Sequence, residues 1–258
     1  MCIILLAHQA HHEYPLILAA NRDEFYERPT AQAHFWKTAK STLAGLDMER
    51  GGTWLGVTMS GRIAAVTNYR EPGMKVNEAA SRGLLVSDFL AGDEQPDEYL
   101  SKLSSRALLY NGFNLVLGCV GELYYFSNRG GRPQEIASGV HGLSNHLLNT
   151  PWPKVWRGQK ALAGVIEGGG SLSIEDIFKV LADDARAVDE ALPETGVGLE
   201  LERMLSPLFI TSPVYGTRSS TVVLFNRHRE VIFVERTFTP ATGGYEDVRY
   251  EFKIRSER

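Results

Sequence analysis

The stretch CIILLAHQAHHEYPLILAANRDE, residues 2–24, decides the fold and raises the first functional question. Residues 2–8 and 16–22 are two apolar runs of strand length, and a turn-like segment with a proline separates them. They predict a β-hairpin. The reactive thiol of Cys2 stands at the very start of its first strand, directly behind the initiator methionine.

Three more hairpins follow the first along the chain. Apolar runs predict paired strands at 54–59 with 62–68, at 113–120 with 122–127, and at 220–226 with 231–238. Helices are predicted at 82–91, 97–106, 152–167, after Ser173 and at 199–205. Two further strands are predicted, a short one that ends at Asn145 and an edge strand at 245–254. This order indicates an α+β protein, and two stacked antiparallel sheets with outer helices would use every element, although the order alone does not force that choice. No linker interrupts the chain, so residues 1–258 are predicted to form a single domain.

Composition excludes several classes of protein. The net charge is −4 with scattered basic residues, which argues against a nucleic-acid-binding surface. The two cysteines, Cys2 and Cys119, are too few for a disulfide framework, and Cys119 is expected in the core. No apolar run is long enough to span a bilayer, and the start of the chain lacks the basic region of a signal peptide. We therefore expect a cytoplasmic protein without a transmembrane segment.

Polar residues gather where the predicted strands end. If those ends converge on Cys2, they supply what acyl transfer needs, because a thiol attacks, an amine accepts its proton, and amide donors hold the oxyanion. Removal of Met1 would place thiol and α-amine on one residue, and an α-amine has an ordinary pKa of about 7.7–8.0. The candidate catalytic residues are Cys2, Arg22, Asp23, Asn68, Asn145 and Arg218.

Each candidate also has a structural interpretation. Cys2 could be a small buried side chain, and Arg22 with its acidic neighbours could be a surface ion cluster at a strand end. Asn68 and Asn145 could be turn residues. The histidines near the first turn lack the helical spacing of a metal site, so no metal is predicted there.

Nine short motifs in order make the chain resemble a known family, the NRDE family, also called the transport and Golgi organisation 2 family. They are Met1-Cys2, NRDE at 21–24, GGTWLG at 51–56, TNYR at 67–70, SRG at 81–83, FNL at 113–115, HGLSN at 141–145, PWPKV at 151–155 and YGTRSSTV at 215–222. The resemblance runs from Met1 to about Phe238. It implies a relative of the N-terminal nucleophile hydrolases, with a four-layer αββα sandwich.

The resemblance also implies roles for the six candidates. Cys2 corresponds to the nucleophile, Arg22 steadies its thiolate, and Asp23 orients the α-amine. Asn68 and Asn145 bind the oxyanion or the amine, and Arg218 completes the charge network. The implied reaction is hydrolysis of the C–N bond of a linear, non-peptide amide.

One departure from the related hydrolases leaves the acidic residue open. Their arginine and aspartate are two residues apart, whereas Arg22 and Asp23 are adjacent and would face opposite sides of an extended strand. Either the strand ends by Asp23 or Glu24 takes the acidic role.

A second function remains open on the same scaffold. The resemblance also allows a non-catalytic carrier of haem, lipid or acyl-CoA, whose candidate haem ligands are Cys2, His8, His11 and His12. The predicted ligand is therefore a small-molecule amide or a lipid-like molecule. The hydrolase needs no cofactor, and haem enters only as the ligand of this alternative.

Overall fold

The computed structural model describes residues 2–39, 41–74, 79–168, 171–239 and 243–255. Within them the strands form two antiparallel sheets. Sheet A has the order β10 (Gly139–Leu143), β1 (Cys2–His8), β2 (Leu16–Phe25), β11 (Tyr215–Phe225), β12 (Glu230–Thr239) and β13 (Gly244–Lys253). Sheet B has the order β3 (Thr30–Phe35), β4 (Thr42–Asp47), β5 (Leu55–Thr58), β6 (Arg62–Asn68), β7 (Phe113–Cys119), β8 (Glu122–Ser127) and β9 (Gln134–Glu135).

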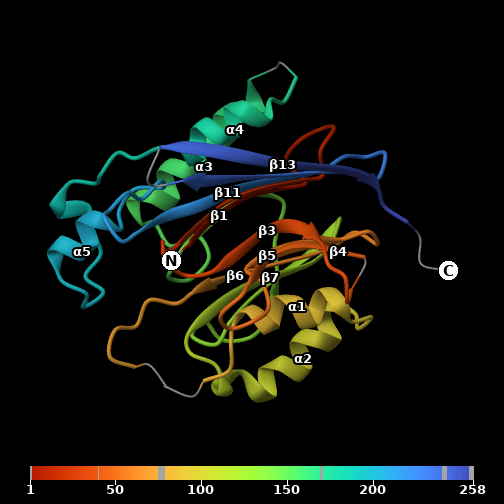
Figure 1. Ribbon diagram of the computed structural model, residues 1–258, viewed down its shortest axis with the longest axis horizontal. Helices are drawn as coiled ribbons and strands as arrows, with labels where there is room; N and C mark the ends of the chain where they lie inside the picture. Colours follow the sequence, from red (N-terminus) through yellow and green to blue (C-terminus); the bar gives the residue numbers. More distant parts are fainter. Residues whose placement is uncertain (1, 40, 75–78, 169–170, 240–242, 256–258) are drawn as a thin grey trace.

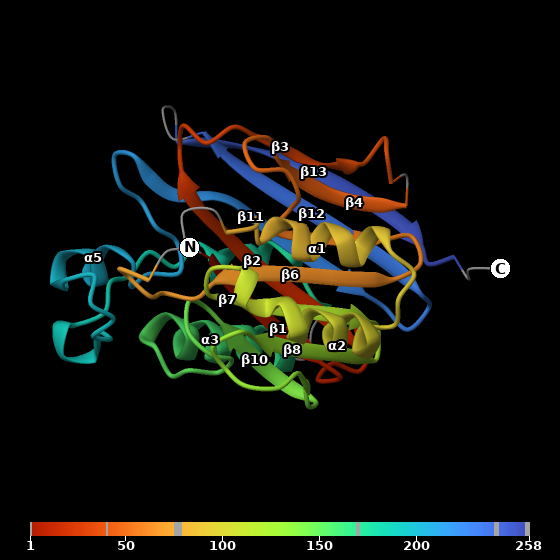
Figure 2. The same cartoon turned by 90° about the horizontal axis from the view of Figure 1, so that it is seen from below.

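Helices cover the outer face of each sheet. Figures 1 and 2 show α1 and α2 on sheet B, and Figure 1 shows α3 and α4 on sheet A. The helices are α1 (Gly83–Ala91), α2 (Pro96–Arg106), α3 (Pro153–Glu167), α4 (Ile174–Leu181) and α5 (Leu199–Met204), with 3₁₀ turns at Ala107–Leu109 and Asp189–Ala191. The layers therefore follow the order helix, sheet, sheet, helix, which confirms the predicted αββα sandwich.

The apolar runs that predicted the first hairpin are continuous because both faces of sheet A are covered. Ile4 and Leu6 belong to the core between the sheets, whereas Ile3 and Leu5 belong to the core under α3 and α4. A strand that is buried on both sides needs apolar residues at successive positions, since neighbouring side chains point to opposite faces. Position 2 shares the inner face with Ile4, so the Cys2 side chain points towards sheet B.

The predicted hairpins and helices are present, and the sequence analysis missed three strands. β3, β4 and the two-residue β9 were not predicted, because β3 and β4 are short and their apolar residues alternate only weakly. The edge strand predicted at 245–254 is β13, which lies at one edge of sheet A. Ser173 caps α4 as its position suggested, since its hydroxyl accepts a hydrogen bond from the Asp176 amide. None of the described helices is long and apolar enough to cross a membrane.

Candidate functional site

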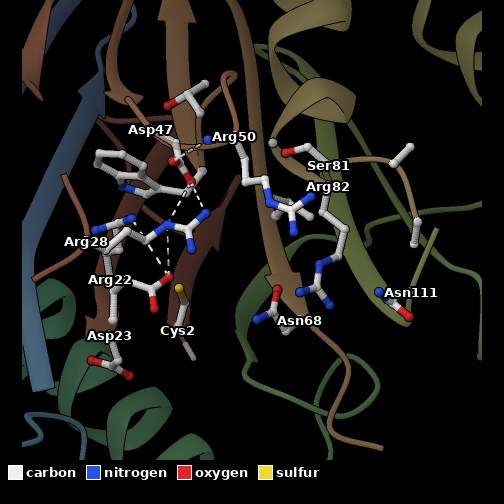
Figure 3. Close-up of a pocket in the computed structure, with 17 residues that line it drawn as sticks. Cys2, Arg22, Asp23, Arg28, Asp47, Arg50, Asn68, Ser81, Arg82 and Asn111 are labelled. Atoms are coloured by element: carbon white, nitrogen blue, oxygen red, sulfur yellow. Dashed lines mark hydrogen bonds and ion pairs between the residues drawn. The ribbon is translucent and has the colours of Figure 1, made fainter. Parts of the chain in front are cut away.

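A cavity of about 370 Å³ opens beside Cys2. We call it the Cys2 cavity. Figure 3 shows several of its lining side chains around this space. Its lining residues come from β1, the end of β2, β4, β6 and the segment that leads into α1: Cys2, Arg22, Asp23, Glu24, Arg28, Asp47, Arg50, Thr53, Trp54, Val66, Asn68, Ala79, Ala80, Ser81, Arg82, Gly83 and Asn111.

Strand register brings Cys2 and Arg22 together. The two residues are direct partners in the β1–β2 ladder, so their side chains share the inner face of sheet A. Cys2 is a free, half-buried cysteine. The Arg22 guanidinium lies over the ring of Trp54, 4.3 Å from its centroid, and its Nη1 has no hydrogen-bond partner among the described residues. This leaves a buried positive charge beside the thiol.

The pKa of the Cys2 thiol is raised, chiefly by burial, and the charge of Asp23 raises it further. Arg22 and a hydrogen bond from the Asp23 backbone amide oppose this rise in pKa, because both favour the thiolate. The net direction means that the thiol is protonated at neutral pH. A base must therefore accept its proton before it can attack a substrate.

Asp23 and Arg22 extend in opposite directions from β2 (Figure 3). The strand does not end at Asp23, because it continues to Phe25. Asp23 is buried on the outer face, where its Oδ1 accepts a hydrogen bond of 2.8 Å from Thr217, and burial raises its pKa. Glu24 shares the face of Arg22 and lies 3.9 Å from its guanidinium. Arg22 and Asp23 therefore lie on opposite faces of β2, as expected for adjacent residues of a strand. Both acidic residues, Asp23 and Glu24, nevertheless line the cavity and remain part of the candidate site.

Asn68 lies across the cavity from Cys2, at the end of β6 (Figure 3). Its position is fixed by hydrogen bonds between the two sheets. The Asn145 side chain donates to the Asn68 carbonyl at 3.0 Å, and the Arg70 amide donates to the Asn145 carbonyl at 2.7 Å. Asn145 is fully buried and is not among the residues that line the cavity, so it positions Asn68 rather than facing the cavity itself.

Ser144 extends this network to Cys2. Its hydroxyl donates to the Cys2 carbonyl at 3.2 Å, and its own carbonyl accepts a bond of 2.6 Å from Thr67. The motifs TNYR and HGLSN therefore join the two sheets at the edge of the cavity.

Arg218, like Asn145, is not among the residues that line the Cys2 cavity. It is the extra residue of a β-bulge in β11, between the positions that pair with Asp23 and Arg22. Its guanidinium donates to the carbonyls of Phe25 and Arg28, at 2.9 and 3.0 Å. Through these two bonds, Arg218 holds the turn after β2 in place.

Lys154 is a site residue that sequence reasoning missed. It lies in the first turn of α3, is 2% exposed, and its Nζ has no hydrogen-bond partner among the described residues. Burial lowers its pKa to about 8, while the negative charges of Asp23 and Cys2 act in the opposite direction. The signal was present in the motif PWPKV, but a single lysine at a helix start does not indicate burial.

The sequence analysis also missed the arginines that surround the cavity. Arg28 is neutralised, because it binds Asp47 at 2.8 Å and also faces Glu24 and Glu49. Arg82 lies at the start of α1 and donates to the Gly112 carbonyl at 2.9 Å. Figure 3 shows the Arg82 side chain extending towards Asn68. The motif SRG was part of the family resemblance, but no role was assigned to its arginine.

The histidines proposed as haem ligands lie at the other end of the first hairpin. His8 ends β1, six residues from Cys2, which is about 20 Å along a strand. His11 and His12 follow in the turn, and the ring of His11 packs against that of His12. Cys2 therefore cannot share one haem iron with these histidines. Among the described residues, no cluster of three or more histidine, cysteine or acidic side chains could hold a metal ion.

A second, larger hollow of about 820 Å³ continues from the Cys2 cavity. The two share Glu24, Arg28, Asn68, Arg82 and Asn111. We call the second hollow the apolar groove, because its lining includes Phe25, Leu201, Met204, Leu205, Val214 and Tyr215. Phe25 and Val214 are 51% and 64% exposed, so the groove presents apolar surface to solvent beside the thiol.

Comparison with known proteins agrees with the fold and the motifs. The family described as Transport and Golgi organisation 2 matches residues 1–240. The Transport and Golgi organization protein 2 homolog of Bos taurus is 37% identical, over 99% of this chain and 100% of its own length. The Transport and Golgi organization protein 2 of Drosophila melanogaster is 29% identical, over 93% of each chain.

Among solved structures, a cysteine-to-alanine mutant of the conjugated bile acid hydrolase from Clostridium perfringens has a similar fold. The TM-score is 0.55 at 10% sequence identity, and the match covers 99% of this chain and 98% of that one. At this level of identity the likeness concerns the fold alone.

Proposed function

Because this chain belongs to the Transport and Golgi organisation 2 family and has the fold of N-terminal nucleophile hydrolases, we propose that it hydrolyses a non-peptide amide with Cys2 as nucleophile. One observation carries the proposal. The start of β1 and the ends of β2 and β6, far apart in the sequence, place Cys2, Arg22 and Asn68 around one cavity.

The first half of the reaction requires that Met1, which lies outside the described residues, is removed. The freed α-amine of Cys2 then accepts the thiol proton, and the thiolate attacks the amide carbonyl carbon. Arg22 stabilises the thiolate, and the Asn68 side-chain amide donates to the oxyanion of the tetrahedral intermediate. The intermediate collapses as the protonated amine passes its proton to the leaving nitrogen. A free amine departs and an acyl-Cys2 thioester remains.

The second half returns the enzyme to its starting state. The α-amine accepts a proton from water, and the resulting hydroxide attacks the thioester carbonyl. The carboxylic acid leaves, and the proton returns to the Cys2 sulfur. In this scheme Asp23 orients the α-amine from the outer face of β2, while Asn145 and Arg218 act through the backbone segments that they hold.

A chromogenic amide tests the proposal. We expect a protein whose loss of Met1 is verified by intact mass to release p-nitroaniline from octanoyl p-nitroanilide and to carry an octanoyl group on Cys2. Cys2→Ala should lower the rate at least 100-fold, because Cys2 is the one thiol among the described residues that line the cavity, and should leave the thermal midpoint nearly unchanged.

Cys119→Ala is the matched control, since it removes the only other thiol of the chain. It should retain both the rate and the octanoyl adduct. Hydrolysis that survives Cys2→Ala, or an adduct found on Cys119 instead, would contradict the assignment of the nucleophile.

The apolar groove favours a second candidate, a carrier of lipid-like ligands that performs no chemistry. Its exposed apolar lining suits an alkyl chain whether or not a bond is cleaved. Turnover of an amide by the wild-type protein, together with its loss in Cys2→Ala, distinguishes the hydrolase from the carrier.

A further inference from the structure

Arg82 is the cation of the Cys2 cavity that a ligand can most readily use. Among the described residues, no carboxylate lies within 4.0 Å of its guanidinium, and its one hydrogen bond is the bond from Nη1 to the Gly112 carbonyl. By contrast, carboxylates surround Arg28, and Trp54 stacks on Arg22. With respect to the described residues, most of the five N–H donors of Arg82 therefore remain for a ligand.

The backbone beneath Arg82 is held rigidly. Gly52 approaches Gly83 so closely that an added Cβ would lie 2.4 Å from the Gly83 carbonyl carbon. The Thr53 amide also donates to the Gly83 carbonyl at 3.2 Å. The backbone at Arg82 is thus fixed where its own motif SRG packs against the motif GGTWLG, which lowers the entropic cost of binding a ligand.

Arg50 adds a second positive charge to the same cavity. It lines the Cys2 cavity and does not line the apolar groove, and its ion-pair partner, Glu49, lies 4.0 Å away. Arg82 lines both spaces. Arg82 therefore stands where the two spaces meet, Arg50 lies farther into the Cys2 cavity, and the apolar side chains belong to the groove.

We propose that the ligand of this site is an anionic amphiphile, an amide whose acyl chain occupies the apolar groove and whose carboxylate or phosphate, on the amine side, binds Arg82 and Arg50. The inference rests on the proposed function for the cleavage step, which releases a fatty acid and an anionic amine. Arginine suits either head group, because its fork of donors matches the oxygens of both.

Binding to Cys2→Ala tests the proposal without any chemistry. We would measure N-dodecanoylglycine, its neutral counterpart N-dodecanoylglycinamide and dodecyl phosphate by calorimetry. The anionic probes should bind at least about tenfold more tightly than the neutral amide. If only one anionic probe shows this preference, it identifies the head group as carboxylate or phosphate.

Substitutions in the same Cys2→Ala background locate the two subsites. Arg82→Gln should remove the preference for anionic probes, whereas Arg82→Lys should keep part of it. Leu201→Ser should weaken the binding of all three probes by similar factors, because Leu201 lines the groove and does not line the Cys2 cavity.

Equal affinity for charged and neutral probes, or a preference that survives Arg82→Gln, would overturn the inference. These outcomes are separate from failure of the proposed function. A wild-type protein that binds N-dodecanoylglycine through Arg82 but never cleaves an amide would refute the hydrolase and leave the anion site in place.

Discussion

Buried charge is the main feature of the site at the scale of single residues. Cys2, Asp23 and Lys154 are each shifted towards their neutral forms by burial. Lys154 and Asp23 lie close enough for their charges to act on each other, and both act on the thiol. The site is therefore a network in which removing one charge changes the pKa of the others.

Lys154 should make stability depend on pH. Its pKa falls from 10.5 to about 8 on folding, so between these values the unfolded chain binds more protons and the free energy of unfolding rises with pH. Lys154→Met removes this contribution. From pH 7.5 to 9.5, the wild type should gain about 2 kcal/mol relative to the variant, as measured by urea denaturation at each pH.

Lys160 provides the control on the same helix. It is exposed on α3, so Lys160→Met should show no such change between the two pH values. A Lys154→Met protein whose stability follows the wild type across this range would show that the buried amine keeps its ordinary pKa.

At the scale of elements, the site depends on how closely β4, β5 and α1 approach one another. Gly51 and Gly52 both have positive φ, +69° and +74°, in the turn that follows β4. They differ in their surroundings, since a Cβ at Gly51 meets nothing within 4 Å, whereas one at Gly52 collides with the backbone of Gly83. Both glycines of the turn therefore require a positive φ, but only Gly52 is packed against neighbouring backbone.

Alanine at these two positions should separate backbone strain from packing. Gly51→Ala should cost roughly 1–2 kcal/mol, because an L-residue adopts this conformation with strain. Gly52→Ala should cost clearly more and should displace Arg82 with the start of α1. Denaturant midpoints give the cost, and binding of N-dodecanoylglycine to each variant in the Cys2→Ala background reports on Arg82. Equal losses of stability would contradict the close packing against Gly83.

At the scale of the whole molecule, the stacking of the two sheets brings Cys2 and Asn68 to the same edge of the sandwich. Cys2 begins the second strand of sheet A, and Asn68 ends a central strand of sheet B. The bonds from Thr67 to Ser144 and from Asn145 to Asn68 join the two sheets there. Relative movement of the sheets would therefore change the distance between Cys2 and Asn68, the proposed nucleophile and the proposed oxyanion donor.

An N-terminal extension should abolish activity without unfolding the protein. An extension joined to Cys2 converts its α-amine into an amide, which has no basic lone pair for the thiol proton. We expect an extended protein to show a thermal midpoint close to that of the mature form and no hydrolysis of octanoyl p-nitroanilide. Protease removal of the same extension, leaving Cys2 first, should restore hydrolysis, and full activity before cleavage would exclude the α-amine as the base.

The local pattern of apolar and turn residues was sufficient to predict most of the strands and helices. The hairpins of β1 with β2 and β7 with β8 were predictable, because apolar runs separated by turn residues define neighbours along the chain. β3 and β4 were not, since β3 has one buried position and β4 is buried through its pairing with β5, which the local pattern does not show. The candidate residues Cys2, Arg22 and Asn68 were identified from strand ends and motifs, whereas Arg82 and Lys154 were not singled out.

The sequence by itself determined most of the strands, the helices and the identity of the leading thiol, because periodicity and composition act over a few residues. Only the tertiary structure decided which side chains surround that thiol. Opposite faces of one strand separate Arg22 from Asp23, and sheet stacking brings Asn68 to Cys2. Burial of Lys154, and the finding that Arg82 forms no ion pair within the described part of the chain, likewise depend on packed neighbours, which no local pattern contains.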